Sequence, residues 1–514
     1  MLAAGRRATR PAAGRPVGGL LITGTSSDAG KSVLVAGICR WLASQGAKVA
    51  PFKAQNMSLN SFVTRSGAEI GRAQAAQAQA CMIEPEAVMN PVLLKPGSDT
   101  SSQLIVLGQV VAEHDAASYW DSARSGLLDV VVGAYHDLAS RFDVVICEGA
   151  GSPAEINLRQ ADIVNMGFAR AAGIPALVVG DIDRGGVFAS FVGTLAVLDP
   201  EDQALVAGFV VNKFRGDRAL LEPGLDMLRE ITGRPVAGVL PFVSDIGVDA
   251  EDAIDWALMR SGGPPVGQDV LRVCVIAFPR MSNHTDIDAL AVEPGVIVRF
   301  ARHAAELADA DLIVLPGTRA TVFDLRWLTE RGIDRAIARH AAAGKPVLGI
   351  CGGYQMLGTA IEDPVESGAG HVAGLGLLPV RTFFEQAKTL ARPSAVLADG
   401  TVVHGYEIHH GLVAREGGEP FFGGEGCRSG PVAGTVWHGL LENDGFRWSY
   451  LTEVSHLGGR GFTVAPDTSF AAIREARLDR LGALVESHLD KDLLAELLAT
   501  GGRPGPTMNV TLGR

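Results

Sequence analysis

Apolar runs of strand length recur along the chain, and helix-length segments separate them. GGLLIT, FDVVIC, IPALVVG and ALVAGFVV are each dominated by Val, Ile, Leu and Ala, with hardly a polar residue. Strands that are apolar at successive positions are buried on both faces, and strands that alternate with helices pair in parallel. The pattern predicts an α/β fold of the doubly wound type, in which helices cover both faces of a parallel sheet.

The same alternation starts a second time after RSGGPPVGQD, a segment rich in Gly and Pro at residues 260–269. LRVCVIAF, VIVRF, ADLIVLPG and KPVLGICGG are the apolar runs of this second set. A chain of 514 residues is also too long for one ordinary domain. We expect a disordered extension at 1–17, a first domain at 18–259, a linker at 260–269, a second domain at 270–490 and a tail at 491–514, frayed over GGRPGPTMNVTLGR at its end.

Charge and cysteine content exclude several classes of protein. The formal net charge of -12 argues against a surface whose main task is to bind nucleic acid. No apolar stretch reaches the roughly 18 residues that a membrane span requires. The six cysteines are scattered without a CxxC pair or a cluster at metal-ligand spacing, which is typical of reduced thiols in the cytoplasm. The sequence does not determine the oligomeric state, and a homo-oligomer is one of the alternatives.

The first strand leads into a loop that suits a nucleoside triphosphate. LLITGTSSDAGKS combines an apolar strand, a Gly-bearing loop, and Lys31 and Ser32 at the start of a helix. Loop N–H groups would face the phosphates, Lys31 would contact the terminal phosphates, and Ser32 would bind Mg²⁺. Five residues separate Gly24 from Gly30, one more than in the common pattern, so the loop fits only if Thr25 replaces the first glycine. We predict ATP binding here.

Polar residues follow the ends of other strands in the first half, where ligands of open α/β sheets bind. Glu148, after FDVVIC, is the candidate second ligand of Mg²⁺, with a plain turn residue as the alternative. Asn212, in VVNKF, could contact the nucleotide base or cap a loop, and the sequence does not separate the two roles. Candidates for holding the acceptor or for phosphoryl transfer are Lys53, Asp181, Asp183 and Arg184.

The second half contains a candidate nucleophile. KPVLGICGGYQMLG runs from an apolar strand through Cys351 into a helix, with Gly349 before the cysteine and Gly352 and Gly353 after it. Small neighbours suit the sharp turn of a nucleophile elbow, and the N–H after the nucleophile can stabilise an oxyanion. The alternative is a buried cysteine in a Gly-rich turn. ADLIVLPG ends another strand at Gly317, whose N–H could complete the oxyanion hole.

A cysteine nucleophile needs a general base. Three of the 12 histidines are candidates: His438 in GTVWHGLLEND, and His409 and His410 in GYEIHHG. The residues alone do not decide among the three.

The second domain resembles the class I glutamine amidotransferases of the triad type, which have a flavodoxin-like fold. The resemblance implies that Cys351 attacks the glutamine amide, that His438 is the general base and that Gln355 contacts the substrate. Most of that family carries Glu two residues after the histidine, but Leu440 occupies the position here and Glu442 lies four residues after. A missing orienting carboxylate marks the cobyrinate-amidating subgroup.

The first domain resembles the dethiobiotin synthetase-like ATPases, which activate a carboxylate with ATP. Both halves together resemble the cobyric acid synthase family of cobalamin biosynthesis from about residue 18 to 490. The blocks PFKAQNMSLNS, EGAGSPAEINL, DIDRGGVFAS, NKFRGD, ICGGYQMLG and GYEIH carry this resemblance. It implies amidation of the b, d, e and g carboxylates of the corrinoid adenosylcobyrinic acid a,c-diamide, through acyl phosphates, with glutamine, ATP and Mg²⁺.

Two other functions compete with this one. Cobyrinic acid a,c-diamide synthase has the same architecture but is less similar in the PFKAQNMS and EGAGSPAEINL blocks. A regulator switched by ATP, with an inert amidotransferase-like domain, belongs to a different class, and the intact Cys351 and His438 argue against it.

Overall fold

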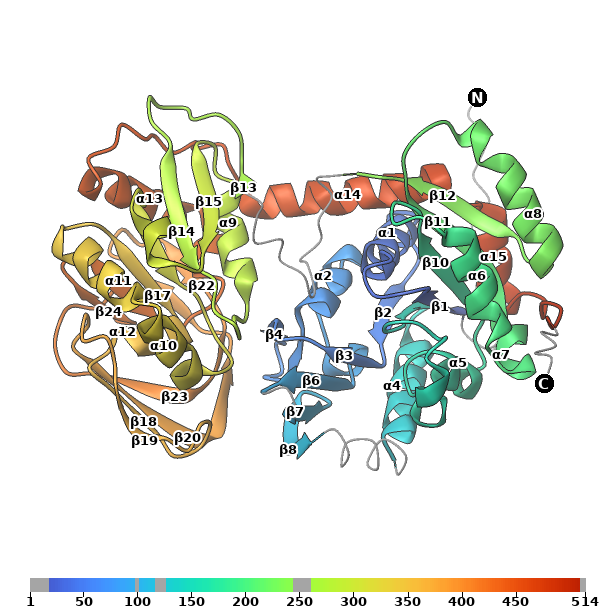
Figure 1. Ribbon diagram of the computed structural model, residues 1–514, viewed down its shortest axis with the longest axis horizontal. Helices are drawn as coiled ribbons and strands as arrows, with labels where there is room; N and C mark the ends of the chain where they lie inside the picture. Colours follow the sequence, from blue (N-terminus) through green and yellow to red (C-terminus); the bar gives the residue numbers. More distant parts are fainter. Residues whose placement is uncertain (1–17, 98–100, 116–125, 244–259, 509–514) are drawn as a thin grey trace. The chain divides into compact units, whose positions relative to one another are not determined.

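The computed structural model describes residues 18–97, 101–115, 126–243 and 260–508, so the extension predicted at 1–17 lies outside the described residues. The chain divides into two compact units, each drawn from separate segments. The first unit comprises Met1–Ala54, Ala123–Ser244 and Leu481–Arg514, and the second comprises Gln55–Ser122 and Asp245–Arg480. Figure 1 labels the elements of both units.

A six-stranded parallel sheet forms the centre of the first unit, in the order β12-β11-β10-β1-β9-β2. Its strands are β1 (Gly18–Gly24), β2 (Val49–Lys53), β9 (Val144–Glu148), β10 (Ala176–Asp181), β11 (Val206–Phe214) and β12 (Val236–Pro241). The central strands β1, β9 and β10 are the apolar runs expected from the sequence, and they are almost wholly buried.

Helices pack against the strands of this sheet. They are α1 (Lys31–Ser44), α4 (Leu128–Arg141), η3 (Ile156–Ala161), α5 (Met166–Ala172), α6 (Val187–Ala196), α7 (Pro200–Leu205), η4 (Arg218–Leu220), α8 (Glu222–Thr232) and α15 (Lys491–Thr500). α1 contacts β1, β2 and β9, and α6 contacts β10, β11 and α8. In Figure 1 α6 and α8 are green and α1 is dark blue.

α15 corrects the expectation that the tail begins at residue 491. Its Leu494 and Leu497 are buried, and a Cβ on Gly18 would lie 2.4 Å from the Leu498 carbonyl oxygen. The helix therefore packs closely on β1. The Gly- and Pro-rich composition that suggested fraying begins only at Gly501, after the helix has ended.

A seven-stranded sheet forms the centre of the second unit, in the order β13-β15-β14-β16-β17-β25-β24. Its strands are β13 (Arg260–Ser261), β14 (Leu271–Ile276), β15 (Val296–Ala301), β16 (Leu312–Leu315), β17 (Val347–Ile350), β24 (Cys427–Ser429) and β25 (Val432–Thr435). The five strands between the antiparallel edges are parallel and follow the flavodoxin-like order 2-1-3-4-5. The two central sheets confirm the predicted α/β class.

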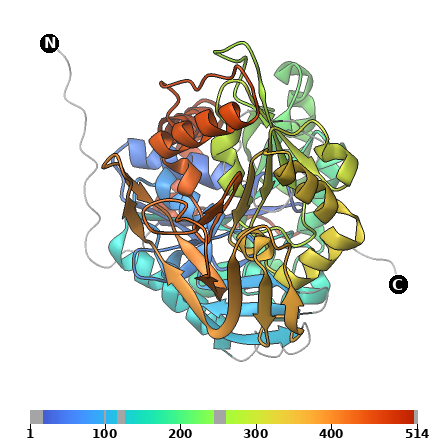
Figure 2. The ribbon, with the colours of Figure 1, turned by 90° about the vertical axis from the view of Figure 1, so that its left-hand side faces the viewer.

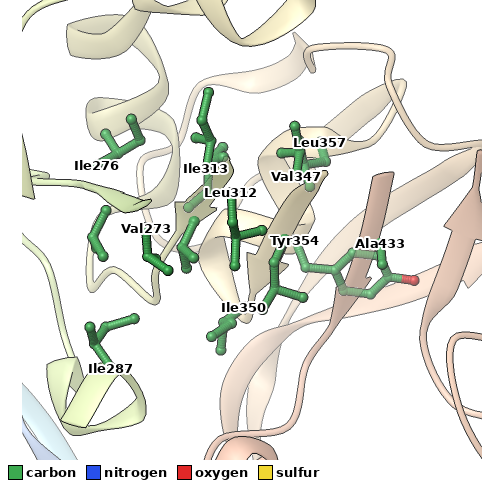
Figure 3. Packing of buried hydrophobic residues seen from close by; sticks show 14 of the residues in the cluster. Val273, Ile276, Ile287, Leu312, Ile313, Val347, Ile350, Tyr354, Leu357 and Ala433 are labelled. Atoms are coloured by element: carbon green, nitrogen blue, oxygen red, sulfur yellow. The ribbon is translucent and has the colours of Figure 1, made fainter. Parts of the chain in front are cut away.

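Helices also surround the second sheet. They are η5 (His284–Ile287), α9 (Asp288–Ala291), η6 (Ala304–Leu307), α10 (Thr321–Glu330), α11 (Ile333–Ala342), α12 (Gly352–Leu357), η7 (Leu440–Glu442), α13 (Asp444–Leu457) and α14 (Phe470–His488), the last of which contributes residues to both units. Figure 3 shows side chains of β14, β16 and β17 packing with Ile287 and Tyr354 in the core.

Smaller sheets complete the second unit. Their strands are β3 (Gln55–Met57), β6 (Val92–Pro96), β7 (Ser101–Val106) and β8 (Gln109–Asp115); β4 (Ser61–Val63) and β5 (Glu69–Gly71); β18 (Ala360–Asp363), β19 (Gly370–Ala373), β20 (Val380–Ala391) and β23 (Glu407–Arg415); and β21 (Ser394–Val396) and β22 (Val402–His404). Helix α2 (Arg72–Ala80) and η1 (Ala87–Met89) lie among them in sequence. Figure 2 shows β20 and β23 in orange.

The division into units differs from a linear division at the predicted linker. Residues 55–122 group with the second unit, and Arg260 and Ser261, predicted as linker, form β13 on the edge of its sheet. Domain boundaries placed at single points along the sequence cannot describe units that are each built from several separate segments. Within the described residues, no helix combines the length and apolarity needed to cross a membrane. All six cysteines are free.

Candidate active site

Cys351 occupies a sharp turn between β17 and α12. Its backbone has φ 49° and ψ −111°, and a positive φ is uncommon for a residue other than glycine. The Cys351 N–H donates to the Thr435 carbonyl at 2.8 Å, which ties the turn to the end of β25. Strained backbone of this kind clusters at active sites. The geometry is that of the elbow predicted from the sequence.

The glycines around Cys351 allow close packing. A Cβ on Gly353 would lie 2.0 Å from the Leu315 carbonyl oxygen, and one on Gly349 would lie 2.6 Å from Leu357 Cδ1. A Cβ on Gly352 would lie 2.7 Å from Thr318 Cγ2. Side chains at these positions would push the turn away from β16 and from its own helix. The three glycines therefore fix where the cysteine lies.

His438 pairs with a carboxylate that the sequence did not reveal. Its Nδ1 lies 2.7 Å from Asp286 Oδ2, and the neighbouring Gly439 N–H donates to Asp286 Oδ1 at 2.7 Å. Both oxygens of Asp286 thus hold the segment that carries the histidine. His438 is 1% exposed, and its Nε2 has no hydrogen-bond partner among the described residues. The ring is oriented so that Nε2 is left for another group.

The charge environment of His438 favours the protonated ring. Burial by itself lowers the pKa of His438, but the Asp286 carboxylate and the Cys351 thiol outweigh it and raise the pKa well above its ordinary value. The influence of Cys351 on this pKa indicates that its thiol lies near the ring. The arrangement suits a Cys–His–Asp triad, in which the aspartate would stabilise the imidazolium.

The alternative partners considered from the sequence have other contacts. Glu442, four residues after His438, pairs with Arg72 at 2.9 Å and with Arg474 at 3.1 Å. His410 Nδ1 lies 3.2 Å from the Glu385 carbonyl oxygen, and His409 Nε2 lies 3.6 Å from Glu407 Oε2.

Sequence reasoning missed Asp286 because it lies 152 residues before His438, in MSNHTDIDAL. One signal could have found it. The segment follows β14, and the carboxyl ends of parallel strands are where ligands and catalytic groups gather.

The remaining residues predicted around the nucleophile are also placed in the second unit. Gln355 is buried; its Nε2 donates to the Gly411 carbonyl at 3.2 Å, and its Oε1 accepts from the Thr321 hydroxyl at 3.3 Å. These bonds hold the start of α12 in place. A Cβ on Gly317 would lie 2.9 Å from His438 Cε1, so Gly317 lies directly against the imidazole ring.

The predicted phosphate loop connects β1 to α1 in the first unit. The Lys31 ammonium donates to the Ser26 carbonyl at 2.9 Å and to the Gly151 carbonyl at 3.2 Å. The Thr25 N–H donates to the Val179 carbonyl at 2.8 Å, which places the start of the loop against β10. Lys31 is thus held across the mouth of the loop, where a terminal phosphate would lie.

Asn212 supports this loop. Its Nδ2 donates to the Ala29 carbonyl at 2.9 Å, and a Cβ on Gly30 would lie only 2.0 Å from that nitrogen. Gly30 also has φ 98°, a conformation that favours glycine. Of the two roles considered for Asn212, this geometry favours holding the loop.

Ser32 and Glu148 offer oxygen ligands for a magnesium ion. The Ser32 hydroxyl donates to Glu148 Oε1 at 2.8 Å, and the Lys53 ammonium donates to the same oxygen at 2.9 Å. The described residues contain no group of three or more His, Cys, Asp and Glu side chains placed to hold a metal. Magnesium in nucleotide sites commonly uses one or two protein oxygens together with phosphate and water. The residues therefore fit an ion that arrives with ATP.

The candidate acceptor residues form ion pairs at the ends of β10 and β11. Asp181 Oδ2 lies 2.8 Å from Lys213 Nζ and 3.5 Å from Arg184 Nε. Asp183 pairs with Arg215 at 3.1 Å, and its N–H donates to Asp181 Oδ1 at 2.9 Å. Asp181 is thus buried and shapes the turn, whereas Asp183 is exposed.

Comparisons with known proteins cover both halves of the chain. The family described as the CobQ/CobB/MinD/ParA nucleotide binding domain matches residues 20–253, and the CobB/CobQ-like glutamine amidotransferase domain matches residues 272–446. Cobyric acid synthase of Streptomyces coelicolor is 63% identical over 493 residues, which cover 95% of this chain and 98% of the relative. The enzyme of the same name from Streptomyces avermitilis is 62% identical, and the match covers 95% of this chain and 98% of the relative. The one from Saccharopolyspora erythraea is 59% identical, and the match covers 95% of each chain.

Proposed function

The chain belongs to the cobyric acid synthase family, and we propose that it amidates four corrinoid carboxylates with ammonia taken from glutamine. The acceptor is adenosylcobyrinic acid a,c-diamide, and the b, d, e and g carboxylates are the groups converted. The enzyme is an ATP-dependent ligase that uses glutamine as its nitrogen donor.

The single observation that carries the proposal is the Cys351–His438–Asp286 arrangement. It provides a nucleophile on a strained turn, a buried base and a carboxylate that orients the base through both of its oxygens. An inert amidotransferase-like domain would have no need of this combination. The arrangement therefore favours an enzyme over a regulator switched by ATP.

In the glutaminase half, Cys351 as thiolate attacks the side-chain amide carbon of glutamine. The carbonyl oxygen becomes an oxyanion, for which the N–H groups of Gly317 and Gly352 are the candidate donors. His438 gives its proton to the leaving nitrogen, so that ammonia departs and a thioester remains on Cys351. A water molecule, deprotonated by His438, then releases glutamate and restores the thiol.

In the ATPase half, an acceptor carboxylate attacks the γ-phosphorus of ATP and forms an acyl phosphate, with ADP as leaving group. Ammonia then attacks the acyl carbon and expels inorganic phosphate. Lys31 and the N–H groups of the loop would hold the phosphates, and Lys53 would hold Glu148 in place. Ser32 and Glu148 would hold magnesium, which would supply positive charge beside the phosphates. Asp181 orients the turn that carries Arg184.

Mass spectrometry of the corrinoid tests the proposal. The purified enzyme is incubated with adenosylcobyrinic acid a,c-diamide, ATP, magnesium and glutamine. Each exchange of OH for NH2 lowers the mass by about one unit, and we expect four successive steps. Two steps from cobyrinic acid, with none from the a,c-diamide, would instead identify an a,c-diamide synthase. Glutamine and ATP turnover without any change in the corrinoid would contradict both functions.

A further inference from the structure

Residues 60–62, which follow the short strand β3 and begin β4, contact the turn that carries Asp286. Asn60 and Ser61 lie against Asn283 and His284, just before Asp286 in the chain. All of these residues belong to the second unit. No catalytic role falls on residues 60–62 in the reaction described above.

The contact consists of reciprocal hydrogen bonds. The Ser61 N–H donates to Asn283 Oδ1 at 2.8 Å. In the other direction, Asn60 Oδ1 accepts from the His284 ring Nδ1 at 2.9 Å and from the His284 backbone N–H at 3.3 Å. Because an amide oxygen only accepts, the His284 Nδ1 carries a proton. Each segment thus contributes one asparagine oxygen to the other, and we call this set of bonds the Asn60–Asn283 clasp.

The clasp acts on a turn that is also held by the Ser282 N–H, which donates to the Gly317 carbonyl at 2.9 Å. Asn283 has φ 51°, a left-handed conformation that Asn tolerates better than most residues do. Ile287, at the opposite end of the same turn, is fully buried in the core beneath the central sheet, as Figure 3 shows. Asp286 lies between these two anchors, so its carboxylate position depends on both of them.

Residues 60–62 also contact His438 indirectly through the aromatic rings of Phe62 and Tyr406. The Phe62 and Tyr406 rings pack with their centroids 5.1 Å apart, and the Tyr406 ring stacks on the His438 imidazole at 5.3 Å. Tyr406 and His438 also exchange backbone hydrogen bonds at 3.0 Å and 2.9 Å. Residues 60–62 therefore support the imidazole ring on its face and, through Asp286, at its Nδ1.

We infer that Asn60 is a positioning residue for glutamine hydrolysis, acting through His284 and Asp286 on His438. The inference rests on the glutaminase site proposed above. Hydrogen transfer between Cys351 and His438 depends on their mutual geometry, and a displacement of about 1 Å can reduce a rate about 100-fold. The hydrogen bonds described above connect Asn60 to His438 only by way of His284 and Asp286, so we expect its effect to be indirect.

Steady-state glutamine hydrolysis by the full-length enzyme tests the inference. Asn60→Ala is expected to lower kcat by about 10-fold or more, with KM for glutamine changed by less than about 3-fold, because binding contacts remain. Asn60→Asp, which keeps the accepting oxygen, should recover a large part of kcat. In an Asp286→Ala background, Asn60→Ala should cause little further loss, since both changes remove the same constraint.

Asn90→Ala is the matched control. Asn90 is also a buried asparagine of the second unit; it accepts from the Gly71 N–H and donates to the Val92 carbonyl, both at the small sheets. Its loss should leave kcat within about 2-fold of the wild type. Equal losses in Asn60→Ala and Asn90→Ala, or full additivity with Asp286→Ala, would overturn the inference.

Two further variants keep the result interpretable. Should Asn60→Ala fail to fold, Asn283→Gly breaks the other half of the clasp while keeping a backbone suited to positive φ, and the same loss of kcat is expected. Cys351→Ser reports on the site itself. If it abolishes hydrolysis while the clasp variants remain fully active, the positioning role alone is wrong. If it retains hydrolysis, the proposed glutaminase site is wrong.

Discussion

Asp286 is the residue on which the candidate glutaminase depends most after Cys351 and His438. Asp286→Asn keeps the shape of the side chain but removes the charge that stabilises the imidazolium. By analogy with the serine protease triad, where the same change costs about 10⁴-fold, we expect a loss of between about 10² and 10⁴ in kcat for glutamine hydrolysis. The rate of glutamate release from glutamine measures this loss in kcat. Glu442→Gln is the control. Glu442 lies four residues after His438 but pairs with two arginines, so its loss should change kcat by less than about 3-fold.

The pairing of His438 with Asp286 also predicts how stability varies with pH. The pKa of His438 in the folded protein is raised above its ordinary value of 6.5, despite burial, by Asp286 and Cys351. The stabilisation is therefore fully present below about pH 6.5 and is lost as the pH rises through the raised pKa. Urea unfolding should show a larger cost of Asp286→Asn at about pH 6 than at about pH 9. An equal or larger cost at the higher pH would show that this ion pair does not stabilise the fold.

At the scale of single elements, the turn from β17 into α12 requires glycine for steric reasons. Gly353→Ala would place a Cβ 2.0 Å from the Leu315 carbonyl oxygen, and overpacking of this kind costs about 1–3 kcal/mol. Gly445→Ala in α13 is the control, because a Cβ there meets nothing within 4 Å and alanine favours a helix by up to about 1 kcal/mol. Chemical denaturation should therefore show a lower free energy of unfolding for Gly353→Ala and a higher one for Gly445→Ala. A destabilisation by Gly445→Ala as large as that by Gly353→Ala would contradict the steric explanation.

The elements that the sequence predicted are those that carry their own local signal. Continuous apolar runs predicted the central strands, and the Gly-rich turns located Lys31 and Cys351. Short strands such as β4 and β21 carry no comparable pattern, because three residues are too few to show a period. Asp286 was not predicted for a related reason: its function arises only when η5 folds beside a histidine 152 residues away. Long-range pairing of this kind leaves no trace in local spacing.

At the scale of the whole molecule, the two halves should fail in different ways. Lys31→Ala is expected to abolish amidation of the corrinoid with either glutamine or added ammonium, because both need the acyl phosphate. Cys351→Ser should abolish amidation with glutamine only and keep at least about half of the ammonium-driven rate. Corrinoid mass spectrometry with each nitrogen source measures both variants. Loss of the ammonium-driven reaction in folded Cys351→Ser protein would mean that the cysteine serves the ATP-dependent step as well.

The origin of the transferred nitrogen tests the central claim most directly. The wild-type enzyme is given glutamine labelled with ¹⁵N in the side-chain amide, together with an equal concentration of unlabelled ammonium, ATP, magnesium and the corrinoid a,c-diamide. Ammonia released at Cys351 and passed on to the acyl phosphate would place ¹⁵N in all four new amides of the wild-type product, whereas Cys351→Ser would place none. Wild-type product that carries only unlabelled nitrogen would contradict the account, since glutamine would then not be the donor.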